Sequence, residues 1–365
     1  MKKRHFILFV TLVGTGLLAL LASCDKEFNP RDKYKDVTIV YCLVNPVDTF
    51  HYVRIHKAFL GPEDVLVMAQ NPDSSLYPVE DLDVRVFEVA LGGSSTKLKV
   101  DTITILSKDT LGYFYAPKQR MYRFEKIFAK SDEAYRPEGI IKIEVENKKT
   151  GKIVYAETSL VNSFSVKSPQ KGYPLNLRPD QFSSKFEWSN AKNGRIYDVF
   201  YTMRYREGRE KDGYNVYTKK SLVWHMGSHS AGKVGDGTTA ENFLYNPGAF
   251  YAQIVREISS DESLWRSPYK EVEVAIWCGS EDLYYYHNIN KPSSGISQER
   301  PEYTNLKTKI YSEELGAYQE LEYEAFGLFS SRIVQYISLN ISEDMVMKHL
   351  PATERQFIKR AVYED

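Results

Sequence analysis

The sequence predicts a mainly β protein, in which an N-terminal immunoglobulin-like β-sandwich is followed by a second β-rich domain with a few short helices. About seven or eight short strand-like segments, separated by turn residues, fall within roughly 120 residues, a spacing typical of such a sandwich. The chain has 27 Tyr and 18 Phe, and aromatic residues favour strands. Roughly 340 residues follow the N-terminal segment, more than the about 250 to 300 at which single cores stop growing, so two domains are expected.

The first 23 residues have the pattern of a secretory signal peptide. Lys2, Lys3 and Arg4 form a positive start, and an almost unbroken apolar stretch runs from residue 6 to residue 22. An uncleaved membrane-anchor helix is the alternative, because such a helix needs about 20 apolar residues. Apolar stretches elsewhere in the chain fall short of about 18 residues, so no further membrane span is predicted.

Residues 21 to 24, Leu-Ala-Ser-Cys, resemble the bacterial lipobox. The resemblance implies that the thiol of Cys24 is acylated, that the peptide bond before it is cleaved, and that Cys24 begins the mature protein. More than one acyl chain suffices for stable membrane attachment without a spanning helix. We therefore expect residues 1–23 to be removed, and we expect a covalent lipid on Cys24 and no other cofactor.

Residues 24–36 are charged, contain Pro30 and lack apolar periodicity, as is typical of a short tether. Asp25 and Glu27 follow the cysteine closely, and acidic residues at this place resemble the surface-export signals of Bacteroidota lipoproteins. The resemblance implies a protein anchored in the outer membrane, with its folded part on the cell surface rather than in the periplasm. An ordinary solvated linker would have the same composition.

Residues 37–160 are predicted to form the immunoglobulin-like sandwich. The first strand is a β-branched run that ends at the breaker Asn45-Pro46. In residues 81–86, apolar side chains alternate with charged ones, which is the period of a half-buried strand. Gly151 supplies the left-handed residue of a hairpin turn. Further strands are predicted at residues 97–106, 112–116, 121–128, 139–147 and 152–160.

Residues 161–179 contain three prolines and are predicted to link the domains. The second domain, residues 180–365, is predicted to be β-rich with short helices. Phe250, Ile254 and Ile258 repeat every four residues, which is helical spacing. Helices are predicted near 247–259, 281–289 and 353–363, and strands at 195–207, 214–226, 269–280 and 324–340.

Several short motifs in the predicted second domain follow one another in a definite order. They are Glu281 with Tyr284 to Tyr286, then Pro301, Asn305 and Ala325 to Ser331. This order resembles a family of Bacteroidota outer-membrane lipoproteins of unknown function (DUF4249-like), and the lipobox, the tether and the strand at 83–86 follow the same layout. The resemblance implies a TonB-dependent receptor nearby as a partner. The first strand, YCLVNP, departs from the family's usual pattern.

The charge balance argues against a nucleic-acid partner. The chain has 48 basic and 48 acidic residues, and removal of Lys2, Lys3 and Arg4 with the signal leaves 45 basic residues against 48 acidic ones. A nearly neutral mature chain lacks the basic patch that binds nucleic acid.

The histidines do not predict a metal site. His225 and His229 have zinc-chelating spacing for a helix, but Gly227 and the glycines that follow favour a polar hairpin loop instead. His51 and His56 are five residues apart in a predicted strand, so they point to opposite faces. We predict no metal ligands.

The carboxylate pairs do not predict a catalytic site. Glu80 with Asp81 and Glu281 with Asp282 lie at a loop edge or a helix start, where solvation and capping account for them. We predict no catalytic residues and expect a protein that is not an enzyme.

The remaining cysteines, Cys42 and Cys278, lie in apolar strands of different predicted domains. A disulfide would clamp the domains together, and the compartment would permit it. Bridging requires Cα atoms about 6 Å apart, a distance that two strand-interior residues from separate cores rarely meet. We therefore favour two buried thiols over a disulfide.

Tyr284, Tyr285 and Tyr286 are consecutive on a predicted helix, so they cannot all share one face. At least one is expected to be exposed or at an interface, where tyrosine suits contact with a partner or ligand. Packing in the core of the second domain is the alternative. Together these features favour an accessory lipoprotein that binds an outer-membrane transporter or surface complex, with a surface glycan-binding protein or hydrolase as the second hypothesis.

Overall fold

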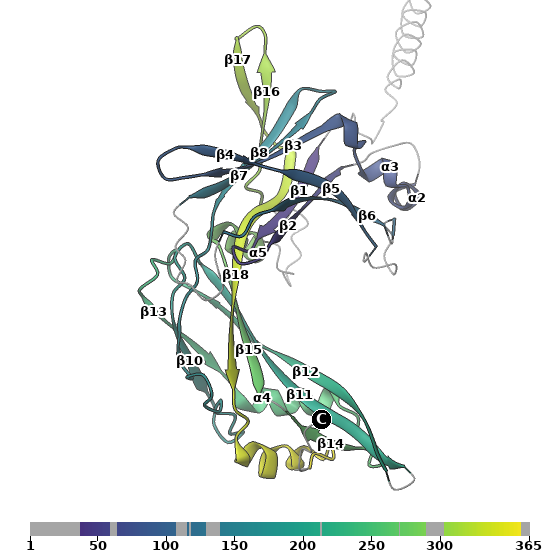
Figure 1. Ribbon diagram of the computed structural model, residues 1–365, viewed down its shortest axis with the longest axis vertical. Coiled ribbons are helices and arrows are strands. Elements are labelled where there is room, and N and C mark those ends of the chain that lie inside the picture. The colour runs from purple at the N-terminus through teal and green to yellow at the C-terminus, as the bar shows by residue number, and fades with distance from the viewer. Residues whose placement is uncertain are drawn as a thin grey trace, which may run out of the picture.

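The structure is a computed structural model that describes residues 37–58, 64–106, 115–116, 118–128, 139–211, 214–269, 271–289 and 303–358. The predicted signal peptide, Cys24 and the tether therefore lie outside the described residues. The predicted fold class is confirmed, because strands dominate and the helices are few and short. Figure 1 shows two β-rich lobes stacked along the long axis of the molecule. Within the described ranges, each helix is too short or too polar to cross a bilayer.

The N-terminal lobe is a sandwich of two sheets. One sheet contains β1 (Thr38–Val44), β2 (Phe50–Lys57), β6 (Gln119–Glu125), β5 (Val100–Ile105) and the first half of β18 (Ala325–Leu339). The other has the order β17 (Ala317–Leu321), β16 (Lys307–Ser312), β8 (Lys152–Ser159), β7 (Ile140–Asn147), β3 (Leu82–Val89) and β4 (Ser95–Leu98). The helices α2 (Val65–Gln70), α3 (Pro72–Ser75) and η1 (Val79–Asp81) lie between β2 and β3.

The period-2 pattern of these strands builds the core of the sandwich. Val40, Ile55 and Phe124 from one sheet and Val86 and Ile143 from the other are buried in a single apolar cluster. Most polar side chains of these strands lie on the outside, as the alternation predicts, and His51, Thr158 and Thr308 are buried exceptions.

The domain boundary differs from the prediction that residues 180–365 form the second domain. β16 pairs with β8, and β18 pairs in parallel with β1 over Ala325–Ser331, so residues 307–331 complete the N-terminal sandwich. The chain therefore leaves the first lobe near residue 160 and returns to it near residue 303. Sequence periodicity identifies strands but not their partners, because the pairing residues are far apart in the chain.

The C-terminal lobe packs a second set of sheets around a separate core. Its larger sheet contains β12 (Tyr214–Ser230), β11 (Ile196–Lys211), β15 (Val272–Gly279) and the second half of β18, with β14 (Trp265–Pro268) on β11. Its smaller sheet contains β13 (Ala240–Tyr245), β10 (Ser184–Ser189) and β9 (Val166–Ser168). Trp188, Tyr197, Tyr201 and Phe250 are among the fully buried side chains of this core.

The predicted interdomain linker is part of this lobe. Val161, Phe164, Leu175 and Leu177 are buried in the C-terminal core, and β9 pairs with β10. Residues 161–179 thus form a packed edge of the C-terminal lobe rather than a free connection.

Two of the three predicted helix regions are helical. α4 (Pro247–Glu257) has Pro247 in its first turn and the side chain of Asn246 as its cap, and it buries Phe250 and Ile254. α5 (Glu281–Ile289) occupies the second region. The described part of the third region, residues 353–358, contains only the end of the short helix η3 (Pro351–Thr353), which follows the π-helix η2 (Met345–His349).

Residues 354–358 leave the helical path for a physical reason. Glu354 and Gln356 have φ angles of 57° and 55°, in the left-handed region that interrupts a helix. Phe357 forms a bridge with Arg266 of β14 and is buried in the C-terminal core. Burial of this aromatic ring outweighs the local sequence pattern that predicts a helix near 353–363.

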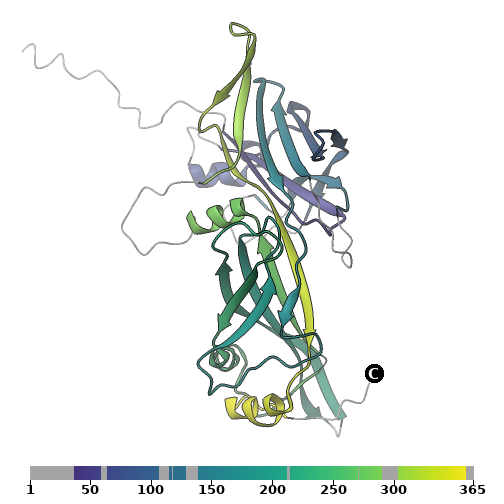
Figure 2. The same cartoon turned by 90° about the vertical axis from the view of Figure 1, so that its left-hand side faces the viewer.

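β18 joins the two lobes as one continuous strand (Figures 1 and 2). It pairs with β1 as far as Ser331 and with β15 from Arg332 onward. The Ser331 hydroxyl donates to the Val44 carbonyl at 3.1 Å and accepts from the Val161 amide at 3.0 Å. The junction is therefore hydrogen-bonded and buried, and not a flexible hinge.

Candidate functional site

The predicted contact residues Tyr284, Tyr285 and Tyr286 lie on α5, at the level where the two lobes meet (Figures 1 and 2). Tyr286 points to the N-terminal lobe, since its hydroxyl lies 3.3 Å from the hydroxyl of Tyr41 in β1. The Tyr284 ring lies under the guanidinium of Arg195, at 4.9 Å, in the C-terminal lobe. Tyr285 is exposed. The three side chains do not form one contact surface, because Tyr286 points to the N-terminal lobe, whereas the rings of Tyr284 and Tyr285 pack edge to face at 5.3 Å.

A larger aromatic surface lies on the outer side of the C-terminal sheet. We call it the aromatic face, and it consists of Asp198, Phe200, His225, Trp277, Arg332 and Tyr336. Alternation creates it, because neighbouring residues such as Tyr197, Val199 and Ile276 point inward and are buried. Strand register aligns its members in rows, with Phe200 opposite His225 and Asp198 opposite Trp277.

A pocket of about 320 Å³ opens at the end of the aromatic face nearest α5. Leu283 and His287 of α5 form one wall, and the sheet forms the floor. Gly279 allows α5 this close approach, because a side chain there would overlap Leu283. The lining residues are Ile196, Asp198, Phe200, Trp277, Cys278, Gly279, Leu283, His287 and Arg332.

The pocket combines aromatic surfaces with one acidic and one basic group. The Arg332 guanidinium lies 4.6 Å from the centre of the Trp277 ring, and the Phe200 ring stacks on His225 at 4.7 Å. Burial lowers the pKa of Arg332, and the nearby Asp48 charge opposes this effect. Asp198 accepts a hydrogen bond from Ser228 at 2.5 Å. Such a site can stack a flat or ring-shaped group and hydrogen-bond its polar edge.

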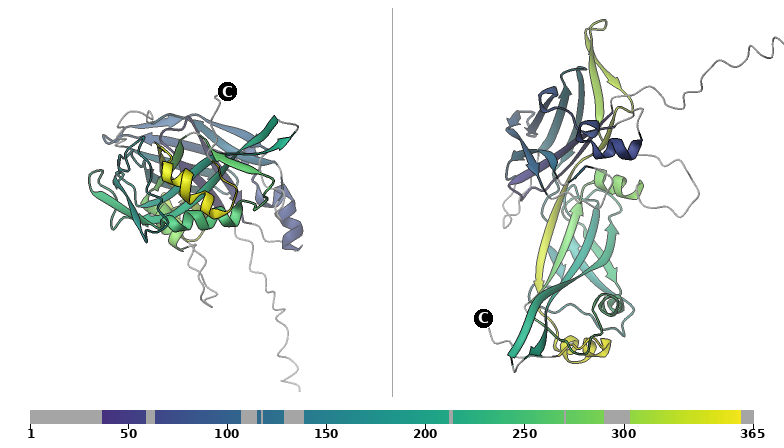
Figure 3. Two further views of the ribbon diagram at one scale, coloured as in Figure 1. Left: turned by 90° about the horizontal axis from the view of Figure 1, so that it is seen from below. Right: turned by 90° about the vertical axis from the view of Figure 1, so that its right-hand side faces the viewer.

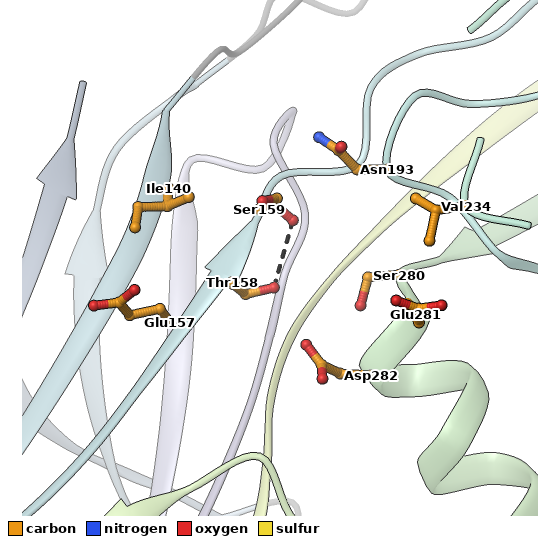
Figure 4. Close-up of a pocket in the computed structure, with 9 residues that line it drawn as sticks. All are labelled: Ile140, Glu157, Thr158, Ser159, Asn193, Val234, Ser280, Glu281 and Asp282. Carbon is orange, nitrogen blue, oxygen red and sulfur yellow. Dashed lines mark hydrogen bonds between the residues drawn. The ribbon is translucent and has the colours of Figure 1, made fainter. Parts of the chain in front are cut away.

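A second pocket, of about 300 Å³, lies where the lobes meet on the other side of the α5 start (Figure 4). Figure 4 shows Ser280 and Asp282 on one side and Thr158 of β8 on the other. One of its acidic groups already accepts a hydrogen bond from the protein, because the Tyr303 hydroxyl donates to the Asp282 carboxylate at 2.6 Å. The Ser280 hydroxyl is hydrogen-bonded to the Ser330 hydroxyl at 2.6 Å. Across the described ranges, His, Cys, Asp and Glu form no group of three that could hold a metal ion.

The histidine pair lies in a strand rather than in the predicted hairpin loop. His225 and His229 both belong to β12, and a bulge opposite Val199 and Phe200 separates them. His225 therefore stacks on Phe200 at the outer face. His229 instead packs beside Trp188, and its Nε2 is hydrogen-bonded to the Glu241 carboxylate at 2.8 Å. The bulge turns the two rings to opposite sides of the sheet. His51 is buried and His56 is half-buried, on opposite faces of β2.

Cys42 and Cys278 are unpaired and buried in the cores of different lobes. Burial raises the pKa of Cys42 to about 12 and also raises the pKa of Cys278. Both thiols are therefore unreactive at neutral pH. Cys24 lies outside the described residues, so its lipidation stays a prediction.

The sequence reasoning missed Phe200, Trp277 and Arg332 as site residues. A sequence pattern could have identified two of them. Phe200 and Trp277 occupy the outward positions of strands whose inward positions are also apolar. Aromatic residues on both faces of a strand indicate that the outer face is not simply solvated. Their arrangement side by side required the pairing of β11 with β15, which no local pattern gives.

No protein-family model matches the chain, and neither does any curated protein. Solved structures with some similarity include the C-terminal globular domain of an oligosaccharyltransferase from Pyrococcus abyssi, with 9% identity and a TM-score of 0.23 over 63% of this chain and 44% of that one. A DUF4785 family protein from Legionella pneumophila has 12% identity and a TM-score of 0.17, over 63% of this chain and 48% of that one. CBD12 from CALX1.2 has 9% identity and a TM-score of 0.15, over 83% of this chain and 100% of that one. The chain spans less than half the length of the first two, and similarity this weak carries no functional argument.

Proposed function

We propose that the protein is an accessory lipoprotein, anchored in the outer membrane through Cys24 and exposed on the cell surface, that binds an outer-membrane partner without catalysis. The observation that carries the proposal is the tetrapeptide Leu21 to Cys24 behind a signal-like segment and before a charged tether. A TonB-dependent receptor is the partner implied by the family resemblance.

The aromatic face supports the partner-binding part of the proposal. Tyr336 is 57% exposed, and it shares this face with His225, Phe200 and Trp277. Tyrosine, tryptophan and arginine are the residues that dominate binding energy at protein interfaces. The backbone beneath is a multi-stranded sheet fixed to the other lobe by β18, so the face is preorganised and little ordering is needed on binding.

Co-purification tests this proposal. A tagged chain is purified from detergent-solubilised outer membranes, and we expect a stoichiometric β-barrel protein to accompany it. The Tyr336→Ala variant should lower recovery of the partner about tenfold or more. Tyr311→Ala is the matched control, since Tyr311 is 52% exposed in the N-terminal lobe. Recovery of the protein alone, or equal loss in both variants, contradicts the proposal.

Anchoring and surface exposure have their own test. Mass analysis of the mature protein should find acyl chains on an N-terminal Cys24, and mild protease treatment of intact cells should degrade the folded lobes. An uncleaved N-terminus would overturn the lipid anchor. Full protection of the lobes would place them in the periplasm and overturn the surface assignment alone.

Glycan binding is the second candidate, and the pocket beside α5 favours it. Sugar rings present apolar C–H faces that stack on aromatic rings, and hydroxyl groups that pair with carboxylate and guanidinium groups. Trp277, Phe200, Asp198 and Arg332 supply these contacts in one pocket. Titration with a panel of soluble polysaccharides should then show binding that Trp277→Ala abolishes and Tyr311→Ala preserves. Absence of binding across the panel removes this candidate.

A further inference from the structure

The short helix α2 leaves three consecutive aliphatic side chains in water. Val65, Leu66 and Val67 are 62%, 50% and 59% exposed. Single exposed aliphatics are ordinary, but a contiguous group on one small element marks a surface that contacts something apolar.

This helix is a fixed part of the lobe. The Asp64 carboxylate caps it by accepting from the Leu66 amide at 2.7 Å. Ala69 is buried, and its carbonyl accepts from the Tyr115 amide at 2.9 Å. The exposed aliphatics are therefore presented outward by a capped and anchored helix.

The helix lies beside the point at which the chain from Cys24 enters the fold. Thr38 begins β1, and its hydroxyl lies 2.9 Å from the hydroxyl of Tyr77. Tyr77 follows α3 by two residues, and α3 packs on α2. Figures 1 and 3 show α2 and α3 together on one flank of the N-terminal lobe.

The tether limits how far this flank can be from the lipid. Residues 25–36 separate Cys24 from the described chain, and twelve extended residues span at most about 40 Å. The bilayer that holds the lipid is therefore within about 40 Å of Thr38, and α2 is part of the flank next to which Thr38 lies.

The charges around Tyr77 are compatible with a bilayer surface. Lys57 lies 5.8 Å from the centre of the Tyr77 ring, and Arg120 donates to the Tyr77 carbonyl at 2.6 Å. The nearby carboxylates, Asp64 and Asp73, lie at the starts of α2 and α3. Lys57 and Arg120 supply positive charge on the flank that carries α2, and basic groups on such a flank favour the headgroup region of anionic lipids.

We propose that α2 is a membrane-contact element, which places Val65, Leu66 and Val67 in the interfacial region of the bilayer that carries the lipid anchor. The inference rests on the proposed lipidation of Cys24. The acyl chains hold the protein on the membrane, and α2 fixes which flank of the N-terminal lobe faces it.

A fluorescent probe at one residue tests the proposal on the lipidated protein. Leu66→Cys is labelled with an environment-sensitive dye and reconstituted into phosphatidylethanolamine and phosphatidylglycerol vesicles that contain a spin-labelled quencher lipid. Val223→Cys is the matched control, because Val223 is an equally exposed aliphatic residue in the C-terminal lobe. The native thiols Cys42 and Cys278 are buried and do not compete for the dye. Circular dichroism verifies that each variant is folded.

We expect both labelled proteins to float with the vesicles, with a blue shift and lipid quenching for the probe at residue 66 only. Flotation without quenching at residue 66 overturns the contact, and leaves the anchor intact. Quenching that is equal at residues 66 and 223 also overturns it. Failure of both proteins to float overturns the lipid anchor itself, and with it this inference.

Discussion

At Gly327, the close pairing of β18 with β1 depends on the glycine itself. Its φ angle is 115°, and a Cβ atom there would overlap the carbonyl oxygen of Val40. No other residue type fits, since the φ angle favours glycine and the parallel pairing with β1 leaves no room. The glycine in the motif from Ala325 to Ser331 is therefore explained by close strand approach.

Replacement of Gly327 by alanine should destabilise the protein by about 2 kcal/mol or more, from backbone strain and steric overlap together. The measurement is the free energy of unfolding in urea. Gly232→Ala is the control, because a Cβ there meets no atom within 4 Å. A Gly327→Ala variant as stable as this control would show that β1 and β18 are not so closely paired.

His51 gives the stability of the N-terminal lobe a defined pH dependence. Its ring is buried against Phe124, and Nε2 lies 2.8 Å from the Lys126 carbonyl. Burial lowers the pKa of His51 from its ordinary value of 6.5, although the Lys126 carbonyl and Asp48 oppose this. The stability that depends on its neutral form is present above pH 6.5, and it is lost as the pH falls from 6.5 towards the lower folded value.

We expect the free energy of unfolding to fall between pH 7.5 and pH 5.5, by about 1.4 kcal/mol for each pH unit that separates the two pKa values. His51→Gln should remove this part of the slope, whereas His225→Gln, on the exposed aromatic face, should keep it. An unchanged slope in His51→Gln would mean that the ring is protonated without penalty in the folded state.

Ser331 is a hydrogen-bonding centre of the junction between the lobes. Removal of its hydroxyl leaves the Val161 amide without this acceptor and the Val44 carbonyl without this donor, in a fully buried place. Ser331→Ala should therefore lower the free energy of unfolding by about 1 to 3 kcal/mol. Ser338→Ala, further along β18, should change it by less than about 0.5 kcal/mol. Equal effects of the two variants would show that the junction gains nothing from these bonds.

The individual strands and helices could largely be predicted from the sequence. The alternation at residues 82–86 and the four-residue spacing of Phe250 and Ile254 each have a local physical cause, and β3 and α4 lie there. β18 also lies within the predicted strand range, but its division between two lobes does not follow from periodicity. Its residues read as one strand, and its partner β1 lies at the other end of the chain.

The candidate site was less predictable than the fold. The prediction placed contact on Tyr284 to Tyr286, yet Tyr286 points to Tyr41, while Tyr284 packs on Arg195 and on the exposed Tyr285. The pocket instead takes Trp277 and Arg332 from two strands that meet only through antiparallel pairing. Asn305 is a motif residue in the family resemblance. Its side-chain amide donates to the Phe329 carbonyl of β18 at 2.7 Å and accepts from the Phe329 backbone amide at 3.0 Å. A motif residue can therefore have a structural role, here the fixing of a strand, rather than a role in ligand binding.

The whole molecule should unfold as one cooperative unit, because β18 belongs to both lobes. The chain has four tryptophans, at positions 188, 224, 265 and 277, and all lie in the C-terminal lobe. Trp fluorescence therefore reports that lobe alone. Phe124→Ala removes a buried ring from the N-terminal core and should destabilise it by about 3 to 5 kcal/mol.

If the lobes are coupled, Phe124→Ala lowers the midpoint of the Trp-monitored urea transition to the same extent as the transition monitored by circular dichroism. Phe50→Ala, at an exposed position on β2, is the control and should leave both transitions near those of the unaltered protein. A Trp transition that does not move in Phe124→Ala would show that the lobes unfold independently.

The pairing of Thr38 with Ala325 also sets the order in which the protein can form. The first described strand finds its parallel neighbour only after nearly the whole chain has been synthesised, and closing so long a loop is slow. The C-terminal lobe takes most of its strands from one continuous stretch, so it can assemble earlier. We expect the N-terminal lobe, although made first by the ribosome, to be the last part to fold. β1 can pair with β2 early, but during synthesis and any transport across a membrane its other edge, which pairs with β18, stays open and must be kept from aggregating.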